Sequence, residues 1–135
     1  MTTADSTAVY ESAVTQVGGQ VEAFLDHGLL IFFAAGAPEE LHDISVLHQA
    51  SIAEDGPQPG DTVHLGDTSM EVLAVGHVVR DNLINLGHLD LKADGRTEAK
   101  LPGDVCVRKG DIPLLAVGDA FRITRPAGTT EEQDQ

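Results

Sequence analysis

Glycine and proline interrupt this chain so often that long helices have little room to form. Fourteen glycines and six prolines divide 135 residues into short apolar segments. Turn residues at such short intervals favour many strands joined by tight turns. The chain has no Trp, one Tyr and four Phe, so a core must be built mainly from Val, Leu, Ile and Ala.

Seven or so of the segments have strand character. The clearest are an apolar run at 29–33, an alternating segment at 44–52, and two alternating segments at 63–65 and 70–74 that flank a Gly-Asp turn. The continuous run at 29–33 is typical of a strand buried on both faces. We therefore predict an all-β fold: a small closed barrel of short, mostly antiparallel strands with one to three short helical turns.

Short helices are predicted at two places where a glycine follows a brief helical pattern. One spans 21–27 and ends at Gly28, and the other spans 82–86, with Asp81 as its N-cap and Gly87 as its end. Glycine suits these ends because it readily takes the left-handed backbone conformation that closes a helix.

The chain is expected to form one domain at 8–125, between polar tails at 1–7 and 126–135. Within the domain, the segment 54–61 contains two prolines, two glycines and three acidic residues. This composition predicts an exposed, mobile connection.

Acidic residues dominate the charge, with 22 Asp and Glu against 8 Lys and Arg and a formal net charge of −14. Nucleic acids and anionic membrane surfaces are therefore poor partners, whereas a basic protein would be attracted. The first residues do not resemble a secretion signal, and no apolar run approaches the roughly 20 residues that span a bilayer. Together with the single cysteine, these features predict a cytoplasmic protein.

Common catalytic and metal-binding motifs are absent from the sequence. No GxSxG, Walker A or GxGxxG pattern occurs, and the six histidines form neither an HExxH motif nor a close pair, so no metal or organic cofactor is expected. Cys106 lies between Val105 and Val107 and is most simply a buried apolar residue. A thiol activated by the nearby Arg108 and Lys109 is the weaker alternative.

His48 is the strongest candidate for a catalytic residue in this sequence. Alternation in 44–52 places it on the same face as its aliphatic neighbours Ile44, Val46, Ala50 and Ile52. A histidine on an apolar wall is mostly neutral at pH 7, and its free ring nitrogen can attack a phosphoryl group. The structural alternative is a core histidine whose two nitrogens are satisfied by hydrogen bonds.

Several ordered blocks of sequence resemble one known family. They are LLIFFAAGAPEELHDISVLH at 29–48, a Pro-Gly-Asp turn at 59–61, LAVGHVVRDNLINLGHLDL at 73–91, DG at 94–95 and LPG at 101–103. Over about residues 8 to 125 the chain is similar to the glucitol/sorbitol-specific IIA component of the bacterial phosphoenolpyruvate-dependent sugar phosphotransferase system.

The resemblance implies a small closed β barrel and a phosphotransferase activity. It implies that His48 accepts a phosphoryl group from phospho-HPr and passes it to the IIB component of a IIB/IIC sugar permease, so that the membrane is reached only through the permease. The alternatives are a non-catalytic barrel or regulatory paralogue that shares the fold, and phosphorylation at Cys106.

The resemblance also suggests supporting groups for the phosphoryl transfer. His88, in the matching LGH block, is a candidate for a supporting or phosphoryl-stabilising residue, with a structural role as the alternative. Backbone N–H groups at Gly36, Gly76 or Gly87 are candidates for binding the phosphoryl oxygens, since glycine lets a ligand approach the backbone closely.

Overall fold

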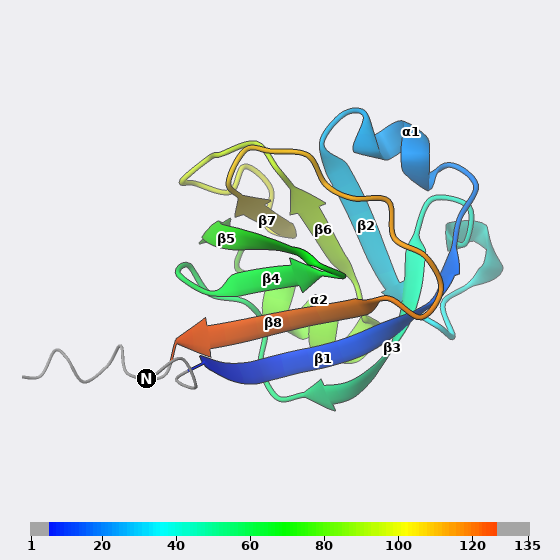
Figure 1. Cartoon of the computed structure of the whole chain (residues 1–135), viewed down its shortest axis with the longest axis horizontal. Helices are drawn as coiled ribbons and strands as arrows, with labels where there is room; N and C mark the ends of the chain where they lie inside the picture. The colour runs from blue at the N-terminus through cyan, green and yellow to red at the C-terminus, as the bar shows by residue number, and fades with distance from the viewer. Residues whose placement is uncertain (1–5, 127–135) are drawn as a thin grey trace, which may run out of the picture.

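The computed structural model describes residues 6–126, which form a closed eight-stranded barrel (Figure 1). Around the barrel the strands follow the order β1-β3-β2-β6-β7-β5-β4-β8. Their bounds are β1 (Ser6–Val17), β2 (Leu29–Ala34), β3 (Val46–Ala53), β4 (Thr62–Leu65), β5 (Thr68–Val75), β6 (Leu89–Lys92), β7 (Asp104–Val107) and β8 (Ala120–Pro126). The predicted small closed barrel is confirmed.

Most neighbouring strands are antiparallel, as predicted. The pairs β2–β3 and β6–β7 are parallel, and the other six are antiparallel. Closure of the barrel gives each strand a hydrogen-bonded neighbour on both sides, which removes the exposed edges that short strands would otherwise present. The turn between β4 and β5 contains Gly66 at φ 60°, in agreement with the predicted hairpin.

Strand β1 is the longest strand, and it contributes an unusual row of inward-facing side chains. Tyr10, Ser12 and Val14 are all buried, although Ser12 is polar. Two register shifts between β1 and β3 lie along this row, one between Glu11 and Ser12 and the other between Val14 and Gln16. Bulges of this kind re-aim side chains near functional sites.

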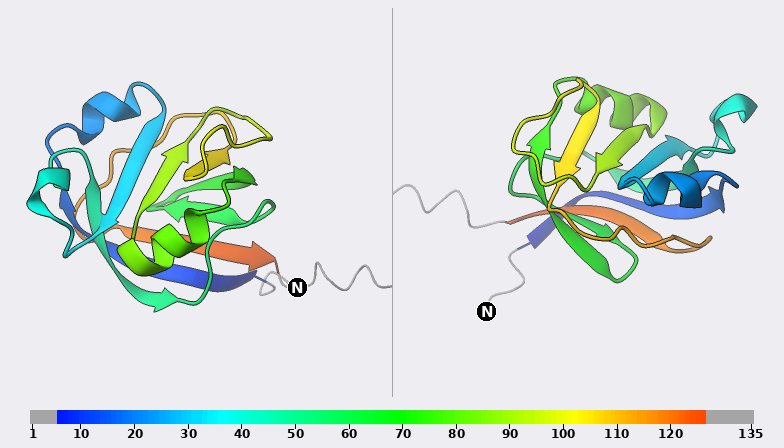
Figure 2. Two further views of the ribbon diagram at one scale, coloured as in Figure 1. Left: turned by 180° about the vertical axis from the view of Figure 1, so that it is seen from behind. Right: turned by 90° about the horizontal axis from the view of Figure 1, so that it is seen from above.

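Three helical segments lie outside the barrel: α1 (Val21–Leu25), η2 (Glu39–Leu41) and α2 (Val79–Leu86). Helices α1 and α2 lie on different sides of it (Figure 2). Helix α2 begins three residues before the predicted start, so Asp81 lies in its first turn and is not its cap. Val79 and Leu83 supply its buried face, and Gly87 ends it in the left-handed conformation, as predicted.

The prediction that the run at 29–33 is buried on both faces was wrong. Leu30 and Phe32 are buried, whereas Leu29, Ile31 and Phe33 are partly exposed. Only one face of a barrel strand turns towards the core, and helices α1 and α2 cover the outer face of β2 incompletely.

The acidic segment 54–61 is only in part the exposed connection that its composition predicts, with Glu54, Gln58, Pro59 and Gly60 exposed. Gly56, Pro57 and Asp61 are buried. The Arg125 guanidinium on β8 binds the Asp55 carboxylate at 2.8 Å, the Asp61 carboxylate at 2.9 Å and the Gly56 carbonyl at 3.0 Å. A cation 64 to 70 positions away in the sequence therefore fixes the segment, and local composition could not reveal it.

The outer limits of the domain differ slightly from those predicted. Ser6 pairs with Pro126 and Thr7 with Arg125, so the first and last of the described residues belong to paired strands. The remainder of both predicted tails lies outside the described residues.

Candidate functional site

His48 lies on β3 with its side chain inside the barrel, as predicted, but burial along the strand does not alternate: Leu47 is buried as well, and Ala50 is exposed. The residue is 1% exposed. Its ring meets the rings of Tyr10, Phe32 and Phe121 edge-on, at centroid distances of 6.0, 5.6 and 5.2 Å. These contacts fix the orientation of the imidazole and place it against an aromatic wall.

Both ring nitrogens of His48 have hydrogen-bond partners. Nε2 lies 2.8 Å from the Gly87 carbonyl oxygen, and Nδ1 lies 3.0 Å from Ser12 Oγ. A carbonyl oxygen can only accept a hydrogen bond, so Nε2 carries the proton in the neutral ring. Nδ1 is then the unprotonated nitrogen and accepts a hydrogen bond from the Ser12 hydroxyl.

Burial lowers the pKa of His48 below its usual 6.5, while the hydrogen bond to Gly87 acts in the opposite direction. Desolvation has this effect because it penalises the charged imidazolium. His48 is therefore neutral at pH 7, and its one lone pair, on Nδ1, accepts the hydrogen bond from Ser12. Both nitrogens are thus satisfied, as the structural alternative predicts.

A hollow of about 350 Å³ opens beside His48. Its walls come from β1, β2, β3, the β2–η2 turn and the end of α2: Tyr10, Ala34, Ala35, Gly36, His48, Gln49, Ala50, Ala53, Leu83, Ile84, Asn85 and Gly87. None of these lining residues is Asp, Glu, Lys or Arg. The partner of Nε2, Gly87, lines the hollow, whereas Ser12, the partner of Nδ1, does not.

The three glycines proposed as phosphoryl-binding donors differ in their surroundings. The Gly76 N–H is bonded to the Asp104 carbonyl, and the Gly87 N–H to the Leu83 carbonyl. The Gly36 N–H makes none of the hydrogen bonds found within residues 6–126, and Gly36 lines the hollow beside His48. Gly36 is thus the glycine of the three whose N–H is free to meet a ligand there.

The structure does not bring the His88 side chain to His48. The His88 ring stacks on Phe33 at 4.2 Å, and Nδ1 donates a hydrogen bond to the Phe32 carbonyl at 3.2 Å. Its Nε2 lies 3.7 Å from the Asp90 carboxylate. No hydrogen bond or ring contact among the described residues joins His88 to His48. Instead, His88, the residue before β6, is connected to β2 on the outer face, next to Gly87.

Sequence reasoning missed one residue of the site and assigned the wrong contact to another. Ser12 was not considered at all, although its place between the inward-facing Tyr10 and Val14 could have suggested a polar group inside the barrel. Gly87 was considered as an N–H donor, but it contacts His48 through its carbonyl oxygen.

The surroundings of Cys106 argue against the alternative of a reactive thiol. Cys106 is fully buried, and Sγ lies 3.9 Å from the Asp94 carboxylate. Burial, followed by the negative charges of Asp94 and Asp104, raises the pKa of the thiol to about 11. A thiol with this pKa is protonated at pH 7 and is a poor nucleophile.

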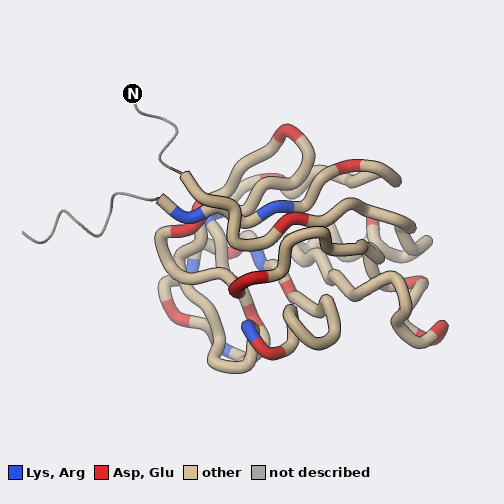
Figure 3. The backbone as a smooth tube through the Cα atoms, turned by 90° about the horizontal axis from the view of Figure 1, so that it is seen from below, with Lys and Arg blue, Asp and Glu red and all other residues tan. Residues whose placement is uncertain are grey.

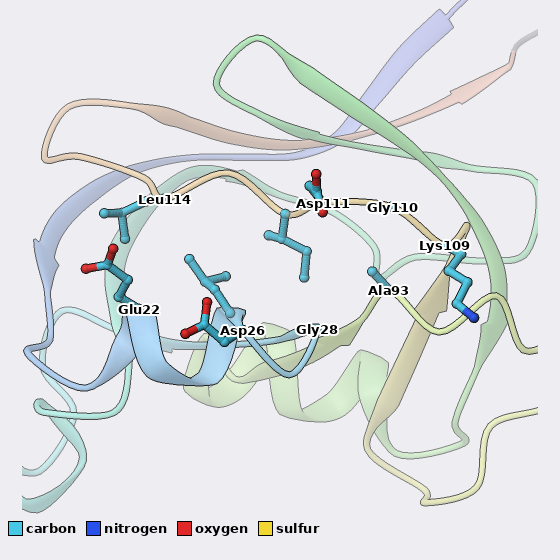
Figure 4. A pocket seen from close by; sticks show the side chains of 10 residues that line it. Glu22, Asp26, Gly28, Ala93, Lys109, Gly110, Asp111 and Leu114 are labelled. Carbon is cyan, nitrogen blue, oxygen red and sulfur yellow. The ribbon is translucent and has the colours of Figure 1, made fainter.

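A second hollow, of about 640 Å³, lies between α1 and the segment that follows β7 (Figure 4). The charged residues Glu22, Asp26, Lys109 and Asp111 are among those that line it. It contains none of the predicted site residues. Among residues 6–126, no group of three or more His, Cys, Asp or Glu side chains is arranged to hold a metal ion.

Acidic positions are spread along much of the backbone (Figure 3). No helix in the described part of the chain is both long enough and apolar enough to cross a membrane.

Comparisons with known proteins agree with the barrel and with the motif blocks. The family model of the PTS system glucitol/sorbitol-specific IIA component matches residues 9–122. The glucitol/sorbitol-specific EIIA components of Shigella flexneri and Escherichia coli K12 are each 36% identical over 107 residues, which cover 79% of this chain and 86% of theirs.

The crystal structure of a PTS system IIA component from Enterococcus faecalis V583 has the same fold. It superposes with a TM-score of 0.70 at 21% identity and covers 82% of this chain and 96% of that one. The match to the family model spans most of the domain, and the curated relatives support it independently. The chain therefore belongs to the family of glucitol/sorbitol-specific IIA components of the sugar phosphotransferase system and is a phosphoryl carrier in sugar uptake.

Proposed function

We propose that His48 is the residue that carries the phosphoryl group. In this proposal His48 accepts the group from phospho-HPr and passes it to the IIB component of a glucitol/sorbitol permease. The observation that supports it best is a neutral imidazole, buried against aromatic rings, at a hollow with no charged lining.

The chemistry is a transfer between two imidazoles followed by a transfer to a thiolate. The N–P bond of phospho-HPr breaks as a new N–P bond forms on His48, and that bond breaks in turn as an S–P bond forms on a cysteine of IIB. Positioning and electrostatic stabilisation supply most of the catalysis in phosphoryl transfer. The aromatic wall of Tyr10, Phe32 and Phe121 limits the access of water to the labile bond.

Neutral donors are available for the phosphoryl oxygens. The Gly36 N–H and the Asn85 side chain line the hollow, and neither makes a hydrogen bond within residues 6–126. The lining residues contain no Lys or Arg. A phosphoryl group held by neutral donors alone is bound less tightly than one paired with cations, which suits a carrier that must give the group away.

His88 enters this proposal through the backbone. Its bond to the Phe32 carbonyl and its stacking on Phe33 hold the start of β6 against β2, directly after Gly87. We expect it to support the site by fixing this junction and not by contact with the phosphoryl group.

The proposed location is the cytoplasm, where HPr and the cytoplasmic domains of the permease would meet the chain. Contact with the membrane would occur only through the IIB/IIC permease. The formal charge of −14 favours rapid association with a partner that presents a basic surface.

Labelling with phosphoenolpyruvate, enzyme I and HPr tests the proposal. Wild-type protein should acquire phosphate that is labile in acid and stable in alkali, and His48→Ala should acquire none. Cys106→Ser and His88→Gln should still be labelled, because neither side chain contacts His48. Undiminished label in His48→Ala, or no label in folded wild-type protein, would exclude His48 as the carrier.

A further inference from the structure

We infer that Ser12 is a positioning residue for phosphoryl transfer: its hydroxyl supports a change of tautomer in His48 that frees Nε2, the nitrogen that receives the phosphoryl group, from the Gly87 carbonyl. The inference rests on the proposed role of His48 and adds which nitrogen reacts and what prepares it.

The position of the two ring nitrogens identifies Nε2 as the reacting atom. Nε2 points to Gly87, which lines the hollow, whereas Nδ1 points to Ser12 inside the barrel. The hollow is where a donor protein can reach the ring. In the resting state, however, Nε2 carries a proton and donates it to the Gly87 carbonyl, so this nitrogen has no free lone pair.

Ser12 can satisfy Nδ1 in either protonation state. In the resting tautomer its hydroxyl donates to Nδ1 across 3.0 Å. When Nδ1 carries the proton instead, Ser12 Oγ accepts that hydrogen bond and its own hydroxyl hydrogen turns to the Phe121 carbonyl, 3.4 Å away. One serine with two partners therefore supports both tautomers of the buried ring.

The change of tautomer needs no net gain of charge. The proton on Nε2 leaves to solvent in the hollow. Nδ1 takes the hydroxyl proton of Ser12, and a proton from solvent replaces it on the serine oxygen, so the ring is neutral before and after the change. The Nε2 lone pair then attacks phosphorus as the N–P bond of the donor breaks, and the donor imidazole retains the bonding electron pair. The product has phosphate on Nε2 and a proton on Nδ1, which donates to Ser12.

The Gly87 carbonyl must turn aside when Nε2 is phosphorylated, because it lies 2.8 Å from that nitrogen and would repel the phosphoryl oxygens. Gly87 ends α2 at φ 64°, and glycine has the widest choice of backbone conformations. The hydrogen bond between His48 Nε2 and the Gly87 carbonyl thus holds the unphosphorylated ring in place.

Nitrogen-15 NMR of the histidine side chains tests the tautomers directly. We expect the proton on Nε2 in the unphosphorylated protein, and phosphorus on Nε2 with a proton on Nδ1 after labelling. Phosphorus bonded to Nδ1, or a resting ring protonated on Nδ1, would overturn the inference. The first result would leave His48 as the carrier, so the two proposals fail separately.

The kinetics of Ser12 variants test the role of the hydroxyl. Ser12→Ala should lower kcat for phosphorylation by phospho-HPr about tenfold, the factor that corresponds to loss of a hydrogen bond of about 1.4 kcal/mol. KM should not change, because Ser12 is buried and does not line the hollow. Ser12→Thr keeps the hydroxyl and should recover most of the rate.

Ser45→Ala is the matched control for Ser12→Ala. Ser45 is also buried, but its hydroxyl has no hydrogen-bond partner in the described structure. The same atom is therefore removed without any effect on His48, and wild-type kinetics are expected. Equal rates for Ser12→Ala and Ser45→Ala would contradict a role for Ser12, whatever the site of phosphorylation.

Discussion

His48 Nε2 and the Gly87 carbonyl oxygen are joined by a 2.8 Å hydrogen bond between residues 39 positions apart in the chain. This bond connects the barrel interior to the end of α2. It also explains why the end of the helix is a part of the site: the peptide that closes α2 is the one that holds the histidine.

Gly87→Ala should disturb both the helix end and the histidine. An alanine Cβ would lie 2.6 Å from the Ala34 nitrogen, in addition to the strain of φ 64°. We expect a loss of roughly 1–3 kcal/mol in the free energy of unfolding, measured with urea. Gly36→Ala is the control, since a Cβ there meets no atom within 4 Å. Equal stability of the two variants would argue against close packing at Gly87.

The stability of the barrel should depend on the protonation of His48. Burial lowers its pKa in the folded state, so the unfolded chain binds more protons between that lowered value and 6.5. The stability that neutral His48 contributes is therefore fully present above about pH 6.5, and it is lost as the pH falls towards the folded pKa. Urea unfolding at about pH 7.5 and pH 5.5 measures the loss.

His48→Gln removes this titration and should lose less stability between the two pH values than the wild type. Burial and the charge of Arg122 also lower the pKa of His64, but His64 is present in both proteins, so its contribution cancels in the comparison. A wild type and variant with the same pH dependence would show that His48 is not buried in its neutral form.

Removal of the Arg125 side chain should cost more stability than removal of the Arg108 side chain. Arg125→Met would leave the buried Asp61 carboxylate without its ion pair, and we expect a loss of roughly 2–4 kcal/mol in urea unfolding. Arg108→Met breaks an ion pair with Glu71 that is well exposed on both sides, and it should change stability by less than about 1 kcal/mol. Similar losses for both variants would mean that Arg125 does not clamp the segment 54–61.

Leu86 is expected to contact the donor protein. It is 53% exposed on α2, between Asn85 and Gly87 at the mouth of the hollow. Leu86→Asn should raise KM for phospho-HPr several-fold with little change in kcat. Leu114→Asn is the control, since Leu114 is 52% exposed but lines the other hollow. A raised KM in both variants, or in neither, would place the docking surface elsewhere.

The sequence was sufficient to predict the barrel, the hairpin at Gly66 and the inward direction of His48. These features follow from local signals, namely alternation and turn residues. The relations that complete the site are not local. Ser12 and Gly87 reach His48 from 36 positions before it and 39 positions after it, and no periodic pattern relates them.

The predictions for 54–61 and 29–33 that the structure corrects failed for the same physical reason. The segment 54–61 has the composition of a loose loop, but Arg125 arrives from the last strand and holds it. The continuous apolar run at 29–33 predicts a strand buried on both faces, but only the face towards the barrel interior is fully buried. In both cases burial depends on which distant segment lies alongside, and this is decided by the closure of the barrel.

Tandem mass spectrometry of the phosphorylated protein, digested at neutral to alkaline pH to preserve the N–P bond, tests the central claim most directly. After reaction with phosphoenolpyruvate, enzyme I and HPr, the phosphoryl group should be on His48. A phosphoryl group found on His88, on Cys106 or on another residue, with His48 unmodified, would contradict it.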